Sequence, residues 1–254
     1  SNEQRQCYFY RQQLLPDLKT PALLWPCNKV MPQAMVYWRE RWLWLDSSTT
    51  DNAVQLWSGV PDSEKVLVRT LPLTYRKLEH MLVRNDTLYL LAQETQNNSV
   101  LLTLQLPDGE VEKIAQFPYL IEQLSWWDKA QLLLAPAQQE LQIYDLQSQS
   151  SQRLGPLTRE LTQAVRYSDQ VLATQFLDYT TDILQLTQTE AGLAFTPWHV
   201  SNRSERLVAY TKQQIAFVSE RAGHSQIWLA DGANSTQLTR LTEQQQVQQL
   251  LWHH

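Results

Sequence analysis

The segment from Ser219 to Thr242, SERAGHSQIWLADGANSTQLTRLT, decides the fold because it shows one structural unit nearly complete. An apolar strand ends at Ser219, a polar tip with Gly223 follows, and a second strand runs to the dipeptide Asp231-Gly232. Asp-Gly favours a tight turn because both residues tolerate a positive φ. A third strand then completes the segment, which therefore predicts consecutive antiparallel strands.

The same pattern recurs along the chain. The second strand of each unit starts 46, 44, 40 and 43 residues after the one before it. A period in this range with short strands is typical of β-propeller blades. The aligned second strands are RWLWLDSS from Arg41, TLYLLAQE from Thr87, QLLLAPAQ from Gln131, VLATQFLD from Val171 and QIAFVSER from Gln214.

Several of these strands are apolar on both faces. In RWLWLD, Trp42 and Trp44 alternate with Leu43 and Leu45, and successive strand residues point to opposite faces. A blade packed between two others needs this pattern, which favours a propeller over a β-sandwich. We expect an all-β propeller of four-stranded antiparallel blades with five recognisable units, at about 33–73, 79–118, 120–158, 163–200 and 206–242.

The two ends of the chain bear on a sixth blade and on the cellular compartment. Residues 247–252, VQQLLW, predict the first strand of a sixth blade. This blade would be completed either by the N-terminal residues Cys7–Tyr10 or by strands beyond His254. We expect residues 1–30 to form an N-terminal segment and residues 31–254 the propeller. A disulfide between Cys7 and Cys27 would tie this segment down and indicate an oxidising compartment, whereas two free thiols would suit the cytosol.

The last unit resembles the TolB-like propeller repeat. The shared elements are the strand Ile215–Arg221 ending in Ser-Glu-Arg, the tip glycine Gly223, the pair Ile227-Trp228, the turn Asp231-Gly232 and the terminal Leu241-Thr242. The other four units share only strand spacing and turns, and they lack the family's usual Ser-Pro-Asp-Gly turn. TolB-like propellers occur in membrane-spanning winged-helix transcriptional regulators of the CadC/ToxR type. The resemblance therefore implies a periplasmic sensor domain, with the DNA-binding domain and the membrane helix outside this sequence.

Composition and motifs give little sign of catalysis. A net charge of −5 with scattered Lys and Arg argues against direct nucleic-acid binding, and no apolar run approaches the ~20 residues of a membrane helix.

We expect no enzyme, cofactor or metal site, because there is no Gly-x-Ser-x-Gly elbow and no metal-ligand spacing among the histidines. The histidines are His80, His199, His224, His253 and His254, of which His224 is expected to be solvated. Four acidic residues are expected to serve turns: Asp46, Asp51, Asp178 and Asp182.

The ten tryptophans allow two interpretations. Trp126-Trp127 and the group Trp38, Trp42 and Trp44 form either an aromatic surface for a partner or the packing between blades, and we favour packing. The leading functional hypothesis is a non-enzymatic periplasmic sensor of a membrane-bound regulator, which binds a protein partner or a small ligand on the propeller face. The alternatives are a soluble TolB-like scaffold that binds envelope proteins and the gating propeller of a serine peptidase.

Overall fold

The described part of the chain consists of strands and the turns between them. The computed structural model describes residues 8–11, 22–26, 34–47, 53–60, 65–71, 75, 77–137, 140–154, 161–177, 180–189, 192–198, 201–210, 214–231, 234–239, 241 and 247. These residues form 22 β-strands, and no helix occurs among them.

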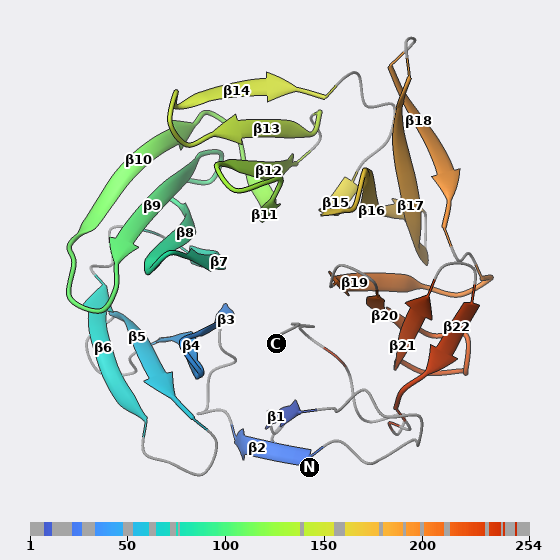
Figure 1. Cartoon of the computed structure of the whole chain (residues 1–254), viewed down its shortest axis with the longest axis horizontal. Helices are drawn as coiled ribbons and strands as arrows, with labels where there is room; N and C mark the ends of the chain where they lie inside the picture. Colours follow the sequence, from blue (N-terminus) through green and yellow to red (C-terminus); the bar gives the residue numbers. More distant parts are fainter. Residues whose placement is uncertain are drawn as a thin grey trace. The chain divides into compact units, whose positions relative to one another are not determined.

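Five four-stranded antiparallel sheets, the blades, account for all but two of the strands (Figure 1). In every blade the strands lie side by side in chain order, so that each strand pairs with the one before it. Consecutive strands pair in this way when the turns that join them are short. The five blades confirm the expected class, an all-β propeller of four-stranded antiparallel units.

The first compact unit of the chain holds two blades and a separate hairpin. The hairpin pairs β1 (Tyr8–Arg11) with β2 (Ala22–Pro26), a strand that the sequence analysis did not anticipate. Cys7 and residues 248–254 lie outside the described residues, so the expected closure of a sixth blade stays a prediction. The first blade contains β3 (Met35–Trp38), β4 (Arg41–Ser47), β5 (Val54–Gly59) and β6 (Val66–Leu71), and the second contains β7 (Lys77–Arg84), β8 (Thr87–Gln93), β9 (Ser99–Gln105) and β10 (Val111–Phe117).

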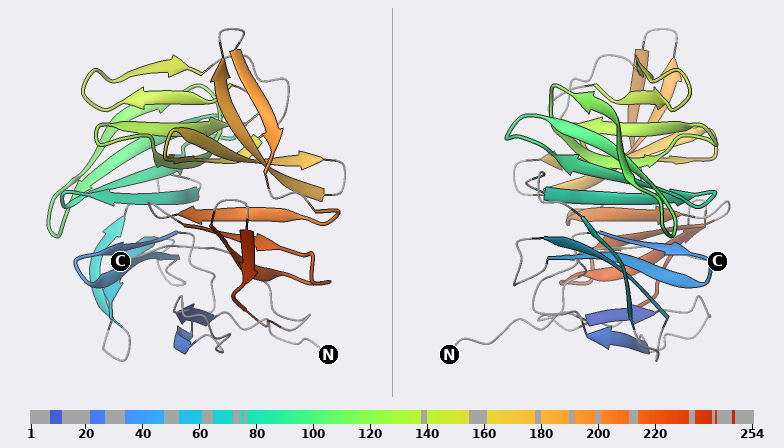
Figure 2. Two further views of the ribbon diagram at one scale, coloured as in Figure 1. Left: turned by 45° about the vertical axis from the view of Figure 1, so that its right-hand side comes forward. Right: turned by 90° about the vertical axis from the view of Figure 1, so that its left-hand side faces the viewer.

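The second compact unit holds three blades, and Figure 2 shows the twist of their sheets from two sides. The third blade contains β11 (Ile121–Trp126), β12 (Gln131–Pro136), β13 (Gln142–Asp145) and β14 (Ser150–Arg153). The fourth contains β15 (Leu161–Tyr167), β16 (Gln170–Leu177), β17 (Thr180–Thr189) and β18 (Gly192–Pro197). The fifth contains β19 (Glu205–Tyr210), β20 (Ile215–Ser219), β21 (Gln226–Asp231) and β22 (Asn234–Gln237).

The strands of the first blade are buried on both faces, as their sequence predicts. Leu43 and Leu45 of β4 join a leucine-rich core with the second blade. Trp42 and Trp44 point to the opposite face and form a smaller aromatic cluster with Met35. The alternation of aromatic and aliphatic side chains therefore supplies two separate cores from one strand.

In the second unit, the fourth and fifth blades share a core centred on Phe217. This side chain of β20 is fully buried and packs with Leu172 of β16 and Ile183 of β17. The ring of Trp198 meets that of Phe217 edge to face, with centroids 5.5 Å apart. Burying a phenylalanine stabilises a fold by about 2–3 kcal/mol, so this contact is a major link between the two blades.

Candidate recognition surface

The turns between the first two strands of a blade are the best-defined surface feature of the first unit. In the first two blades these turns consist of two residues each, Arg39-Glu40 and Asn85-Asp86. All four residues have positive φ, at 44° and 63° in the first turn and 48° and 62° in the second. Asn and Asp adopt this conformation readily, whereas Arg and Glu do so at a cost of about 1 kcal/mol each. Contacts outside the turn must therefore hold Arg39-Glu40 in place.

Those contacts come from Asp86 in the neighbouring blade. The indole Nε1 of Trp38 donates a hydrogen bond to Oδ1 of Asp86 over 2.8 Å, and the guanidinium of Arg39 pairs with Oδ2. The Arg39 guanidinium also lies 5.2 Å from the centre of the Trp38 ring. These hydrogen bonds, first from Trp38 and then from Arg39, lower the pKa of Asp86 below its usual value. An ionised Asp86 thus links the first turns of two blades, and we call this arrangement the turn clamp.

A second clamp occupies the equivalent place between the third and fourth blades. Arg166 of β15 donates from Nη1 to the carbonyl oxygen of Trp127 over 2.9 Å and from Nε to that of Ser168 over 3.2 Å. Its guanidinium stacks 4.6 Å from the centre of the Trp127 ring. The Trp127 turn is itself fixed by Asp128, whose Oδ1 accepts the backbone N–H groups of Ala130 and Gln131, each over 2.8 Å. In both clamps, then, a tryptophan that follows or ends the first strand of one blade meets a charged residue of the next.

A β-bulge in the first strand of a blade positions a further polar contact between blades. In the second, third and fourth blades the register of the first strand shifts by one residue just before His80, Gln123 and Gln163. In the third blade the side-chain oxygen of Gln123 accepts the backbone N–H of Ala164 in the next blade, and Ser125 donates to the Ala164 carbonyl over 2.8 Å. A bulge re-aims the side chains that follow it. The sequence analysis missed these residues, although the recurrence of His or Gln at the same repeat position is a signal that reveals them.

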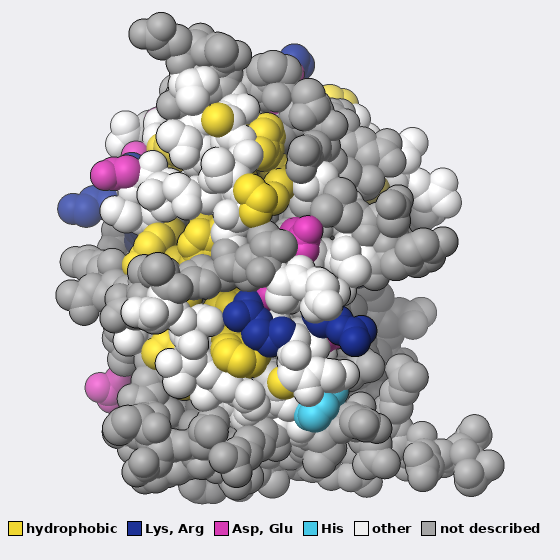
Figure 3. All heavy atoms as spheres, turned by 90° about the vertical axis from the view of Figure 1, so that its right-hand side faces the viewer, with side chains coloured by type: hydrophobic (Ala, Val, Ile, Leu, Met, Phe, Trp, Pro, Cys, Tyr) yellow, Lys and Arg dark blue, Asp and Glu magenta, His cyan; other side chains and the backbone are white. Residues whose placement is uncertain are grey.

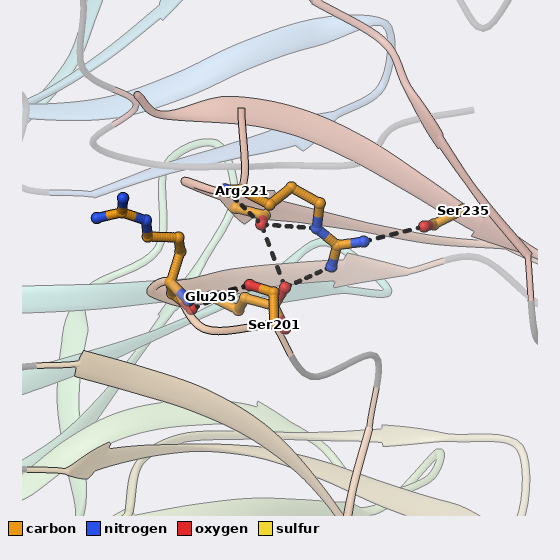
Figure 4. A network of polar contacts seen from close by, with 6 residues as sticks. Ser201, Glu205, Arg221 and Ser235 are labelled. Atoms are coloured by element: carbon orange, nitrogen blue, oxygen red, sulfur yellow. Dashed lines mark hydrogen bonds and ion pairs between the residues drawn. The ribbon is translucent and has the colours of Figure 1, made fainter. Parts of the chain in front are cut away.

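The motif that resembles the TolB-like repeat builds a buried polar network in the fifth blade (Figure 4). The carboxylate of Glu205 is fully buried and pairs through Oε1 with the guanidinium of Arg221. Arg221 also donates to Ser219 Oγ over 3.0 Å and to Ser235 Oγ over 3.2 Å, and it stacks 4.7 Å from the Trp228 ring centre. Glu205 Oε2 is buried and has no hydrogen-bond partner in the part of the chain that the structure describes. Because the guanidinium joins three strands, the Ser-Glu-Arg motif holds the blade together.

The structure places the tryptophans partly as expected. Trp42 and Trp44 are buried, as the packing interpretation requires, and the cluster that they form consists of residues of the first blade. Trp38 and Trp127 are half-buried and belong to the clamps, and Trp126 is half-buried at the end of β11. The tryptophans therefore serve both the core and the turn surface.

Three polar residues differ from expectation. His224 is half-buried, and its Nε2 contacts the carbonyl oxygen of Leu241, so the prediction of a solvated side chain is wrong. Asp46 lies buried within β4 and Asp182 lies within β17, so neither serves a turn as expected. Burial raises the pKa of Asp182.

Several other candidate residues cannot be placed. Cys7, Cys27, Asp51, Asp178, His199, His253 and His254 lie outside the described residues. Within the described ranges, no three His, Cys, Asp or Glu residues gather where they could bind a metal ion. The same ranges contain no helix long and apolar enough to cross a membrane.

Comparisons of sequence and of structure give different results. No protein-family model matches the chain, and no curated protein matches it in sequence. Among solved structures it resembles a putative TolB from Agrobacterium tumefaciens, with 13% identity, a TM-score of 0.63 and 86% of this chain aligned to 84% of that one. It also resembles TolB from Acinetobacter baumannii, with 9% identity, a TM-score of 0.58 and 90% of this chain aligned to 61% of that one.

Parts of two longer enzymes resemble the chain as well. Puromycin hydrolase matches with 12% identity and a TM-score of 0.56, over 81% of this chain and 37% of that one. Oligopeptidase B from Leishmania major matches with 11% identity and a TM-score of 0.54, over 81% of this chain and 33% of that one. Together these likenesses support the β-propeller fold.

Proposed function

We propose that this chain is a non-enzymatic recognition domain that binds a protein partner or a small ligand. The binding surface would consist of the turns Arg39-Glu40 and Asn85-Asp86, which join the first two strands of the first and second blades. The observation that carries the proposal is the Asp86 turn clamp. It holds two turns in a fixed arrangement while the Arg39 side chain stays 64% exposed. Glu40 and Asn85 in the same turns are also exposed. Charged side chains on a pre-organised surface provide electrostatic complementarity to a partner at a low entropic cost of ordering.

For the cellular setting, we propose the periplasmic sensor part of a membrane-bound transcriptional regulator. The Ser-Glu-Arg motif of the fifth blade supports a TolB-like domain, and a disulfide between Cys7 and Cys27 would suit an oxidising compartment. DNA binding and membrane attachment would then belong to other parts of the protein. On the face shown in Figure 3, basic side chains gather in small separate groups beside apolar ones rather than in the continuous stripe typical of a nucleic-acid site.

Site-specific photo-crosslinking tests the binding surface. A photoreactive amino acid replaces Glu40 in one variant and Ser151 in a matched control, where Ser151 is an exposed residue of β14. In cells of the natural host, we expect Glu40 to give a discrete adduct and Ser151 to give none. Equal adducts at both positions, or none at Glu40, would contradict a role for this surface.

A second candidate is the gating propeller of a serine peptidase, which the likeness to oligopeptidase B favours. A third is a soluble TolB-like scaffold, which the likeness to TolB favours equally. The complete reading frame distinguishes all three. A winged-helix domain with one membrane helix supports the sensor, a signal peptide alone supports the scaffold, and a domain with Gly-x-Ser-x-Gly supports the peptidase.

A further inference from the structure

The outermost strand of the first blade has an unusual surface. Among the described strands, β6 pairs only with β5, so one of its edges carries backbone groups without a partner in any of these strands. Val66 and Leu67 at its start are 52% and 42% exposed. The outer strands β10 and β14 instead expose charged and polar side chains, among them Glu112, Lys113 and Arg153. Charged edges prevent unwanted strand pairing, whereas an exposed apolar edge favours it.

Leu67 is also the exposed end of an apolar row that crosses the whole blade. The strand register places Met35, Trp44, Trp57 and Leu67 opposite one another in turn. Met35 and Trp44 are buried, Trp57 is half-buried and Leu67 is exposed. The Nζ atom of Lys65 lies 4.5 Å from the centre of the Trp57 ring. The row therefore continues the aromatic core out to the edge of the sheet.

Hydrogen-bond donors without acceptors gather in the same two strands. Among the described residues, the buried atoms Trp57 Nε1, Ser58 Oγ and Arg69 Nη1 have no hydrogen-bond partner. Leaving such a donor unsatisfied costs about 1–3 kcal/mol. Arg69 belongs to the edge strand itself, so it favours the arrival of a group that offers an acceptor.

We propose that β6 docks an extended segment of another protein by β-strand addition, and that this segment alternates apolar residues with carboxylates. Backbone pairing would extend the sheet, the apolar side chains would cover Leu67 on one face, and the carboxylates would lie on the opposite face, which Arg69 shares. Charge argues for the carboxylates, because the only charged residues from Lys65 to Leu71 are the cations Lys65 and Arg69. Two copies of β6 would bring like charges together, which disfavours self-pairing. The acids Asp62 and Glu64 precede this strand, so the carboxylate is expected opposite Arg69, further along it.

A peptide of defined sequence tests this proposal. The probe is a fluorescein-labelled octapeptide that alternates valine with glutamate, and its partner has lysine in place of glutamate. We expect fluorescence anisotropy to show binding of the acidic peptide to the intact chain, and about tenfold weaker binding of the basic one. The indole N–H signal of Trp57 is expected to shift in the NMR spectrum when the acidic peptide binds.

Variants then assign the binding to this edge. Leu67→Lys is expected to abolish binding of the acidic peptide. Leu67→Thr keeps a strand-forming residue and is expected to weaken this binding, and Arg69→Gln is expected to weaken it about threefold. Glu112→Lys on β10 is the matched control on another outer strand, and Arg39→Ala tests independence from the turn clamp. Both are expected to leave binding unchanged. Three outcomes would each overturn the proposal. The acidic peptide does not bind, it binds the Leu67→Lys variant as well as the wild type, or the chain forms a dimer that Leu67→Lys prevents.

Discussion

Removing the cation from the network of the fifth blade is expected to destabilise the protein strongly. Glu205 is fully buried, whereas Arg221 keeps 23% of its side chain exposed. Breaking a buried ion pair by removing one partner costs about 3–5 kcal/mol, because the other charge stays buried and unpaired. Because Arg221 reaches solvent, we expect a value near the lower limit, about 3 kcal/mol, for Arg221→Met. In a chain of this size that corresponds to a fall in Tm of about 6–12 °C.

Methionine is the informative replacement because its side chain can still pack on the Trp228 ring, which Arg221 now covers. The assay is urea unfolding, followed by circular dichroism and tryptophan fluorescence. Glu205→Gln is expected to cost less, since the Arg221 side chain is partly exposed to water and keeps its contacts with Ser219 and Ser235. The double variant should recover about 1–3 kcal/mol relative to the sum of the two single losses.

Arg39→Met is the matched control because it also removes an arginine from an ion pair, but from one that is largely exposed. Its free energy of unfolding should change by less than about 1 kcal/mol. The reasoning is refuted if Arg221→Met costs no more than Arg39→Met, or if the two substitutions in the fifth blade are simply additive.

Three further predictions concern two turns and the half-buried carboxyl of Asp182. Trp38→Phe removes the hydrogen bond that lowers the pKa of Asp86 most, so an NMR titration should show this pKa returning toward its usual value. In the wild-type protein, the lowered pKa of Asp86 stabilises the fold at pH values above the unfolded-state pKa, and this contribution is lost as the pH falls through the folded-state pKa. The variant should lose part of this contribution. An unchanged pKa of Asp86 in the variant would contradict the clamp. Gly109→Ala places a Cβ 2.5 Å from the backbone oxygen of Gln105 and should cost about 1–3 kcal/mol in urea unfolding, and wild-type stability would refute the close contact. Asp182→Asn should raise Tm at pH 7 but not at pH 3: burial raises the folded-state pKa, so stability falls as pH rises from the usual pKa through the raised one, and a pH-independent difference would contradict this.

Local features of the fold were predictable from the sequence because they depend on adjacent residues. The Asn85-Asp86 turn follows from the tolerance of both residues for positive φ. The burial of β4 on both faces follows from its alternation of tryptophan and leucine. The repeat spacing then gave five blades, because each unit carries the same sequence of strands and turns.

The contacts between blades were not predictable, because they depend on how neighbouring sheets pack. Nothing around Trp38 indicates that its indole reaches Asp86, and the sequence gives no reason why Arg166 should stack on Trp127. Bulges add a second difficulty, since a shift of one residue changes which side chains reach the next blade. The recurrence of His or Gln marks the repeat position of Gln123, but the contact of Gln123 with Ala164 follows only from the register of β11.

The two clamps also carry a consequence for how the chain acquires its structure. Their partners lie 48 residues apart for Trp38 and Asp86, and 39 residues apart for Arg166 and Trp127, which is about one blade in each case. The entropic cost of closing a loop grows only slowly with its length, so neither clamp requires a distant encounter. During synthesis, the second blade can lock onto the first, and the fourth onto the third, as soon as its first hairpin leaves the ribosome, and a pause after that hairpin would leave a stable nascent intermediate.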